Sequence, residues 1–168
     1  MKVAEGKQKF IHTWGRLGAN WGINRTMASV HALLLVSADA MNADEIMAEL
    51  KISRGNANMN LRELMNWGLV HKEIIRGDRK EYFVAEKKLV KVAKLIMKER
   101  RKRELDPIVK TLAELQTIEG DKKDKHVKAY LETVKGLKDL TTKADGLIEL
   151  MLKADESRFL NLLIKLLT

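Results

Sequence analysis

The sequence predicts a mainly α fold: a winged helix-turn-helix, with a three-helix core and a β-hairpin wing, between N- and C-terminal helical dimerisation segments. Three observations predict it. Two short stretches with helix-capping signals meet at a tight turn near residue 52, and two β-prone runs around a Gly-Asp turn follow them. The chain of 168 residues has one proline, so long helices are permitted elsewhere. We expect an N-terminal dimerisation helix at 1–22, the winged helix at 23–86, and a helical dimerisation or effector region at 87–168.

Apolar residues at helical spacing predict a first helix over residues 4–19. Phe10, Ile11, Trp14 and Leu17 recur at steps of three and four residues, which places them on one helix face. Asn24 has the side chain of a good N-cap, so a second helix is expected to begin after it. Its expected buried face is Met27, Val30, Leu33, Leu34 and Val36.

The next two helices form the predicted helix-turn-helix. Asn42 as N-cap, with Glu45 three residues later, resembles a capping box, and the helix after it has room for about two turns. Ser53 then caps a further helix, expected from Arg54 to Trp67. Gly68 is suited to end that helix in a left-handed conformation.

Two β-prone runs, at residues 69–75 and 81–84, follow this helix directly. Residues 76–80 between them include a Gly-Asp pair, which favours a hairpin turn. A hairpin after three helices is the wing of a winged helix.

The rest of the chain is predicted to be helical. Asp106-Pro107 is interpreted either as a new helix start or as a kink. A short helix is expected over residues 127–134, between breaks at Gly120-Asp121 and Gly136, and a last helix from about Asp139 to Leu167. The apolar stripe of that helix is too wide for a solvated helix, so part of it needs a partner. The residues expected to build the dimer are Phe10, Trp14, Leu147, Met151, Phe159, Leu162, Leu163 and Leu166.

The formal net charge of +9 is concentrated in the helix after the hairpin, where residues 86–110 carry ten basic and four acidic side chains. A basic surface attracts phosphate, but also anionic lipid and acidic proteins, so charge alone selects no partner. The densest run, Lys98 to Arg103, is interpreted equally well as a contact with flanking phosphate or as a solvated helix surface with internal pairs. No apolar run reaches the length of a membrane span and no leader opens the sequence, so we expect a cytoplasmic protein without membrane contact.

The stretch from Thr26 to Val84 resembles the winged-helix domain of the MarR superfamily, and most closely the branch of the glycine-betaine synthesis repressor, GbsR. The resembling stretches, in order, are Trp21-Gly-Ile-Asn-Arg-Thr-Met-Ala, Asn42-Ala-Asp-Glu-Ile, Ser53-Arg-Gly-Asn-Ala-Asn-Met-Asn-Leu-Arg-Glu-Leu, Trp67-Gly-Leu-Val and Arg76-Gly-Asp-Arg-Lys-Glu-Tyr-Phe. The resemblance implies a homodimeric regulator of transcription that binds double-stranded DNA at a pseudo-palindromic operator. It favours a repressor over an activator, which the residues themselves leave open.

Under this interpretation the second helix of the motif enters the major groove and the wing approaches the backbone or the minor groove. Arginine pairs with guanine, and asparagine with adenine, through two hydrogen bonds each. A plain solvated helix face is the alternative for the same side chains. The expected DNA-binding residues are Ser53, Arg54, Gly55, Asn56, Asn58 and Arg62 on the helix, and Arg76, Arg79 and Lys80 in the wing.

A different class of function stays open: a winged helix that contacts a protein or an RNA within a larger assembly. The recognition face discriminates between the two, because Arg54 and Arg62 matter only for duplex binding. No motif of an enzyme is present, and the sequence has no cysteine and no metal-ligand spacing among its four histidines. We therefore expect no enzymatic activity and no cofactor, and the sequence identifies no effector. Trp14, Trp21 and Trp67 are interpreted as core residues first, and as a cage for a quaternary ammonium effector second.

Overall fold

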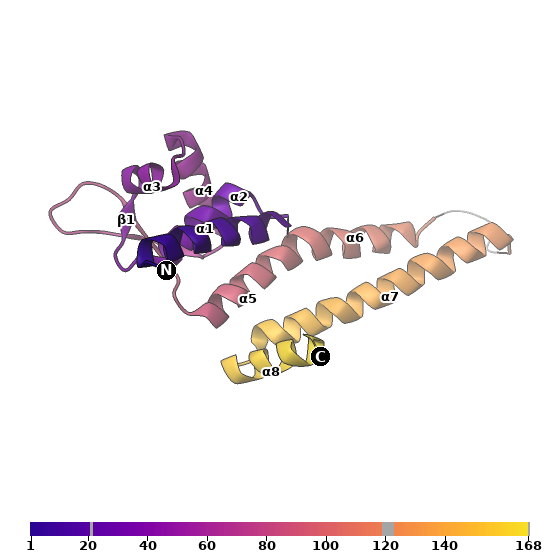
Figure 1. Ribbon diagram of the computed structural model, residues 1–168. Coiled ribbons are helices and arrows are strands. Elements are labelled where there is room, and N and C mark those ends of the chain that lie inside the picture. Colours follow the sequence, from indigo (N-terminus) through magenta and orange to yellow (C-terminus); the bar gives the residue numbers. More distant parts are fainter. Residues whose placement is uncertain (21, 119–122, 168) are drawn as a thin grey trace. The chain divides into compact units, whose positions relative to one another are not determined.

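The computed structural model describes residues 1–20, 22–118 and 123–167 (Figure 1). The chain divides into two compact units, Met1–Val92 and Ala93–Thr168. No helix within the described ranges has both the length and the apolar character needed to cross a membrane.

The first unit is the predicted winged helix with an additional N-terminal helix. A three-stranded antiparallel sheet has the order β1-β3-β2, and the hairpin register pairs Val70 with Ala85 and Glu73 with Tyr82. The short strand β1, which pairs with β3, was not predicted from the sequence. The elements are α1 (Val3–Asn20), α2 (Arg25–Val36), β1 (Met41–Asn42), α3 (Ala43–Leu50), α4 (Arg54–Asn66), β2 (Val70–Glu73) and β3 (Tyr82–Ala85).

Helix α2 is the centre of this unit and packs against α1, α3, α4 and β3. Its Val30 and Ala32 are fully buried, and the helix is apolar around most of its circumference, as a central helix must be. The expected caps are confirmed: the Asn24 side chain accepts hydrogen bonds from the N–H groups of Thr26 and Met27, and Asn42 and Glu45 form the capping box. The other large buried side chains of the unit include Ile46, Leu61, Leu64, Trp67, Leu69 and Phe83.

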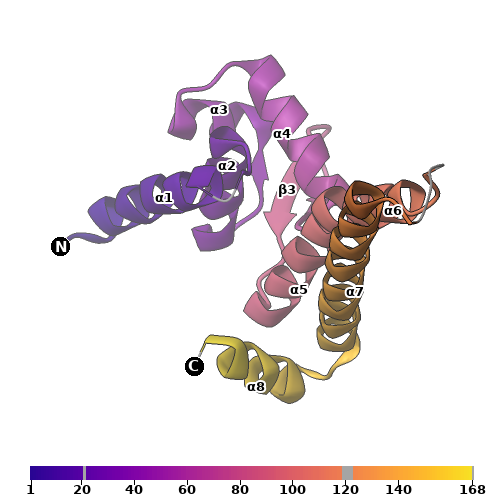
Figure 2. The ribbon, with the colours of Figure 1, turned by 90° about the vertical axis from the view of Figure 1, so that its right-hand side faces the viewer.

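Helix α1 lies directly on α2 because two glycines let the backbones approach (Figure 2). A Cβ placed on Gly15 would lie 2.4 Å from Ser29 Oγ, and one on Gly18 would lie 2.5 Å from the Cβ of Ala28. Helix α1 continues through both glycines. They are packing residues.

The regular secondary structure in the described part of the second unit consists of helices. Helix α5 (Leu89–Arg100), whose first turn belongs to the first unit, leads through the π-helical turn η1 (Arg101–Leu105) into α6 (Asp106–Leu115). Helix α7 (Lys125–Lys153) runs back beside α6, and α8 (Glu156–Leu167) follows. The expected break at Gly136 and the expected helix start at about Asp139 are wrong, because α7 continues through both positions. The expected break at Gly120-Asp121 lies outside the described residues.

The helical backbone continues through Pro107 by widening one turn ahead of it. The N–H of Asp106 donates to the carbonyl of Arg101, five residues back, which is the π-helical pattern. Leu105, ahead of α6, keeps helical dihedral angles and makes no side-chain cap. Of the two interpretations of Asp106-Pro107, the structure favours the irregular turn over a new capped helix.

The true break of the last helix lies at Ala154, whose backbone is extended. Lys94 donates to the Ala154 carbonyl through Nζ, which also lies 5.4 Å from the centre of the Phe159 ring. Phe159 and Met151 are each 1% exposed, so their burial is already provided by this chain. The expectation that these two side chains face a second copy is therefore corrected.

Candidate nucleic-acid interface

The outer face of α4 is the first part of the candidate interface. Ser53 Oγ accepts the N–H of Asn56 and so begins the helix as predicted. Arg54, Asn58 and Arg62 follow at four-residue steps, which puts them on one face, and all three are exposed. Gly55 is exposed too, and its Cβ position has no atom within 4 Å, so the backbone is open to approach there.

Asn56 differs from this group, since its side chain is turned partly inward. It is half-buried, and its Oδ1 accepts a hydrogen bond of 2.7 Å from the Nδ2 of Asn60, which is 3% exposed. The same Nδ2 also donates to the Asn56 carbonyl. We expected Asn56 to read an adenine, but one side of its amide serves the packing of α4. Asn58 is the better placed of the two amides for a base edge.

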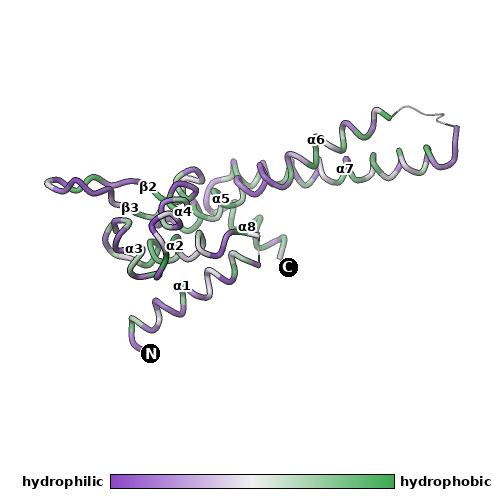
Figure 3. Tube along the Cα trace, turned by 90° about the horizontal axis from the view of Figure 1, so that it is seen from above, coloured by the Kyte–Doolittle hydropathy of each residue, from purple (hydrophilic) through white to green (hydrophobic). Residues whose placement is uncertain are grey.

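The wing is the second part. The residues 76–80 at its tip are exposed, and the hairpin extends beyond the helices of its own unit (Figure 3). Gly77 has a φ of +91°, which a residue with a Cβ rarely adopts. Asp78 accepts hydrogen bonds from the Lys80 N–H at 2.9 Å and from the Tyr82 hydroxyl at 2.8 Å, and these bonds lower the pKa of its carboxyl. Asp78 thus fixes the turn, while Arg76 and Arg79 are presented to solvent.

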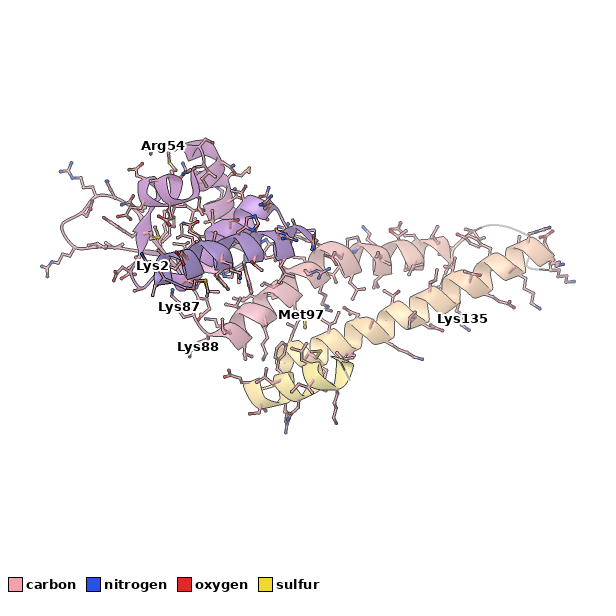
Figure 4. The ribbon with its side chains drawn as sticks, viewed as in Figure 1. Lys2, Arg54, Lys87, Lys88, Met97 and Lys135 are labelled. Carbon is pink, nitrogen blue, oxygen red and sulfur yellow. The ribbon has the colours of Figure 1, made fainter. Side chains whose placement is uncertain are left out.

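One carboxylate connects the two parts. Asp44, in the first turn of α3, lies 2.6 Å from Arg54 Nη2 and 3.7 Å from Lys80 Nζ. Figure 4 shows Arg54 at the beginning of α4. Asp44 was not among the residues expected at the interface, because its partners lie ten and more residues away along the chain.

Met59 is a further outward residue of α4 that was not predicted as a contact. It is 58% exposed, four residues after Gly55 on the same face. An exposed methionine between an asparagine and an arginine offers an apolar contact for the methyl group of thymine. The signal in the sequence was its position on the helical wheel, where an apolar residue occupies the polar side.

The basic run from Lys98 to Arg103 is largely neutralised within its own unit. Arg100 pairs with Glu104 at 2.9 Å and Arg103 with Glu99 at 3.1 Å, both one helical turn apart. Arg101 forms two hydrogen bonds to Asp145 of α7, at 2.5 and 2.9 Å, which hold the pKa of that carboxyl below its usual value. Of the two interpretations, the structure favours the helix surface with internal pairs.

Trp67 has the core role rather than a role in a ligand cage. It is 6% exposed, and its Nε1 donates to Glu63 Oε1 at 3.1 Å. Trp14 stacks on Phe10 with ring centres 5.4 Å apart, and both are half-buried on α1. Trp21 lies outside the described residues. Within the described ranges, no three metal-binding side chains come together.

Comparison with known proteins agrees with the winged-helix interpretation of the first unit. Residues 18–88 match the family model of the sugar-specific transcriptional regulator TrmB. A solved structure of a transcriptional regulator superposes with a TM-score of 0.57 at 17% identity, over 84% of this chain and 96% of its own. The transcriptional regulator Tm0710 from Thermotoga maritima (TM-score 0.41, 17% identity, 84% and 94% covered) and a MepR mutant from S. aureus bound to an oligodeoxyribonucleotide (0.41, 14%, 82% and 92%) are more distant. No curated protein matches the chain.

Proposed function

We propose that this chain, whose residues 18–88 match the TrmB family model, acts as a homodimer on a pseudo-palindromic operator. We also propose that it is a DNA-binding regulator of transcription and not an enzyme, which the match to the TrmB family model supports. The dimer, the operator, repression as its effect and the cytoplasm as its location belong to the same proposal.

The proposed DNA-contacting surface rests on one observation. Cationic and amide side chains lie together on the outer face of α4 and in the wing. Arg54, Asn58 and Arg62 are exposed on the first two turns and the middle of α4, where a recognition helix meets base edges. Arg76 and Arg79 are exposed in the wing, where arginine suits a narrow minor groove. Ser53, Gly55 and Lys80 are assigned to phosphate contacts.

The dimer is proposed from an exposed apolar stripe on α7. Leu137, Leu140, Ala144 and Leu147 follow a 3-4-3 spacing, which is the seam of a coiled coil, and all four are exposed. Leu140 has 65% of its surface exposed and Leu137 has 49%, and adjoining exposed apolar side chains on one helix face often mark an interaction surface. Leu147 was among the dimer residues expected from the sequence. The proposal also keeps five other expected residues: the half-buried Leu162 and Leu163, the exposed Leu166, and Phe10 and Trp14 of α1.

Duplex binding tests the function. The wild type and Arg54→Ala/Arg62→Ala would be titrated against a duplex from the region upstream of the protein's own gene, across a range of salt. The matched control is Lys128→Ala/Lys135→Ala, which removes the same charge from exposed positions of α7. We expect the α4 variant to lose at least about 30-fold in affinity, since each of its two lost bidentate base contacts is worth about 1–3 kcal/mol. The control should lose little.

The protein-contact or RNA-contact alternative predicts another pattern. Binding that falls equally in both double variants would mean that the net charge of +9 acts without a defined site. That outcome would overturn the assignment of α4 as a recognition helix.

A further inference from the structure

We propose that Asp44 is a positioning residue of the interface: its carboxylate holds Arg54 and Lys80 when no DNA is bound, competes with phosphate for them, and so weakens non-specific binding. The inference rests on the proposed DNA-binding face and goes one step beyond it. It assigns a role to an acidic residue in a surface that otherwise attracts an anion.

The geometry brings three separate elements to one carboxylate. Asp44 belongs to α3, Arg54 begins α4, and Lys80 ends the turn of the wing. The Oδ1 atom is 2.6 Å from the guanidinium and Oδ2 is 3.7 Å from the ammonium, so each oxygen faces one cation. A DNA phosphate at the N-terminal end of α4 would bind the same two cations. The Asp44 carboxylate therefore occupies the position that a phosphate takes when DNA is bound.

The pairing is weak enough to be replaced. The side chains of Asp44, Arg54 and Lys80 are 49%, 66% and 55% exposed, so water screens both ion pairs. When a phosphate pairs with Arg54 and Lys80, the released Asp44 carboxylate attracts a salt cation from solution. DNA binding then releases about one counterion fewer than it would without Asp44, and this difference is measurable as a salt dependence.

The carboxylate of Asp44 takes no part in the capping hydrogen bonds of its own helix. The capping box is formed by the side chains of Asn42 and Glu45, and Asp44 contributes only its backbone N–H to Asn42 Oδ1. Asp44→Asn therefore keeps the cap and the size of the side chain and removes the charge. A purely structural role would change the melting temperature, whereas the proposed role changes the salt slope.

The test uses a mixed-sequence duplex of about 30 base pairs, bound by the full chain at several salt concentrations. For Asp44→Asn we expect the log–log salt slope to steepen by up to about 0.9, which is about eightfold tighter binding near ~0.1 M salt. Glu49→Gln is the matched control, because Glu49 lies on the same helix and accepts a hydrogen bond from Gln8 instead of pairing with a cation in the interface. It should leave the slope within about 0.2 of the wild type.

A second background checks the route of the effect. In Arg54→Gln, where the closer cation is gone, Asp44→Asn should give less than half of its gain. A wild type that binds duplex while Asp44→Asn binds with an unchanged or shallower slope would overturn the role of Asp44 alone. A wild type that binds no duplex at any salt would overturn the proposed function, and the role of Asp44 with it.

Discussion

His31 is a residue whose environment could not be foreseen from its neighbours in the sequence. It lies in α2 with 2% of its surface exposed, and its Nε2 has no hydrogen-bond partner among the described residues. Burial, and then the charge of Lys87, lower its pKa from 6.5 to about 4. Lys87 is brought there by three hydrogen bonds to the carbonyls of Leu34, Leu35 and Ser37 at the C-terminal end of α2. Each of these contacts joins residues at least 50 positions apart in the sequence, so no local sequence pattern predicts them.

The buried His31 makes the winged helix sensitive to acid. The pKa of His31 is lower in the folded chain than in the unfolded chain, so the unfolded chain binds the proton first as the pH falls. Its contribution to stability is present above about pH 6.5 and is lost between there and about pH 4. Between pH 7.5 and 5 we expect a loss of roughly 2 kcal/mol in the free energy of unfolding, which urea titrations would measure.

The control for this prediction is His31→Gln, which does not titrate and should lose little stability over the same interval. His71→Gln, at an exposed position of β2, should behave as the wild type. An equal loss in wild type and His31→Gln would assign the acid sensitivity to other groups.

At the scale of elements, the sequence predicted what depends on local chemistry. The caps at Asn24, Asn42 and Ser53 are confirmed because an N-cap acts within three residues of itself. The wing was also predicted, since its turn is set by a glycine and an aspartate at the tip. The strand β1 was missed because two residues carry no periodicity, and they become a strand only by pairing with β3.

Gly136 shows the opposite failure, in which a local signal was given too much weight. A glycine within a helix costs about 1 kcal/mol relative to alanine. Helix α7 has 29 residues and packs along α6, and contacts such as the buried Val134 outweigh that cost. The helix ends instead at Ala154, where no glycine or proline marks the position.

The packing of α1 on α2 gives a prediction at the same scale. Gly18→Ala should lower the free energy of unfolding by roughly 1–2 kcal/mol, because the added methyl group meets the Cβ of Ala28, which is rigidly attached to the backbone. Gly6→Ala, in the same helix with no atom within 4 Å of the new Cβ, should raise it by about 0.5–1 kcal/mol. Urea unfolding of both variants measures the difference.

A compensating change identifies the contact itself. Gly18→Ala/Ala28→Gly exchanges the methyl group between the two helices and should recover about half or more of the loss. If Gly18→Ala were as stable as Gly6→Ala, the two helices would not approach as closely as described.

Across the whole molecule, sequence reasoning predicted the first unit better than the second. The winged helix was predicted nearly in full, because caps, turn residues and hydrophobic periodicity all indicate the same fold. In the second unit the apolar stripe was recognised, but its division between internal packing and an outer surface was not. Met151 and Phe159 turned out to be internal, whereas Leu137, which was not among the expected dimer residues, is exposed. A heptad pattern shows that a helix face needs a partner and does not say which partner.

We propose that a second copy of the chain covers this outer surface of α7. Leu140→Lys places a charge in the centre of the stripe, and in a symmetric dimer the change acts twice. Losing two buried leucine contacts at about 1.5 kcal/mol or more each predicts a dissociation constant at least about 100-fold higher, measured by sedimentation equilibrium.

Thr142→Lys adds the same charge at an exposed position two residues away, outside the stripe, and should leave the dimer intact. Since Leu140 is 65% exposed in the single chain, the monomer itself should stay folded, and its circular dichroism would confirm this. The Leu140→Lys monomer should bind an isolated half-site as the wild type does and lose its advantage on a two-half-site duplex. A wild type that sediments as a monomer, or a Leu140→Lys variant that still dimerises, would exclude the stripe as the dimer interface.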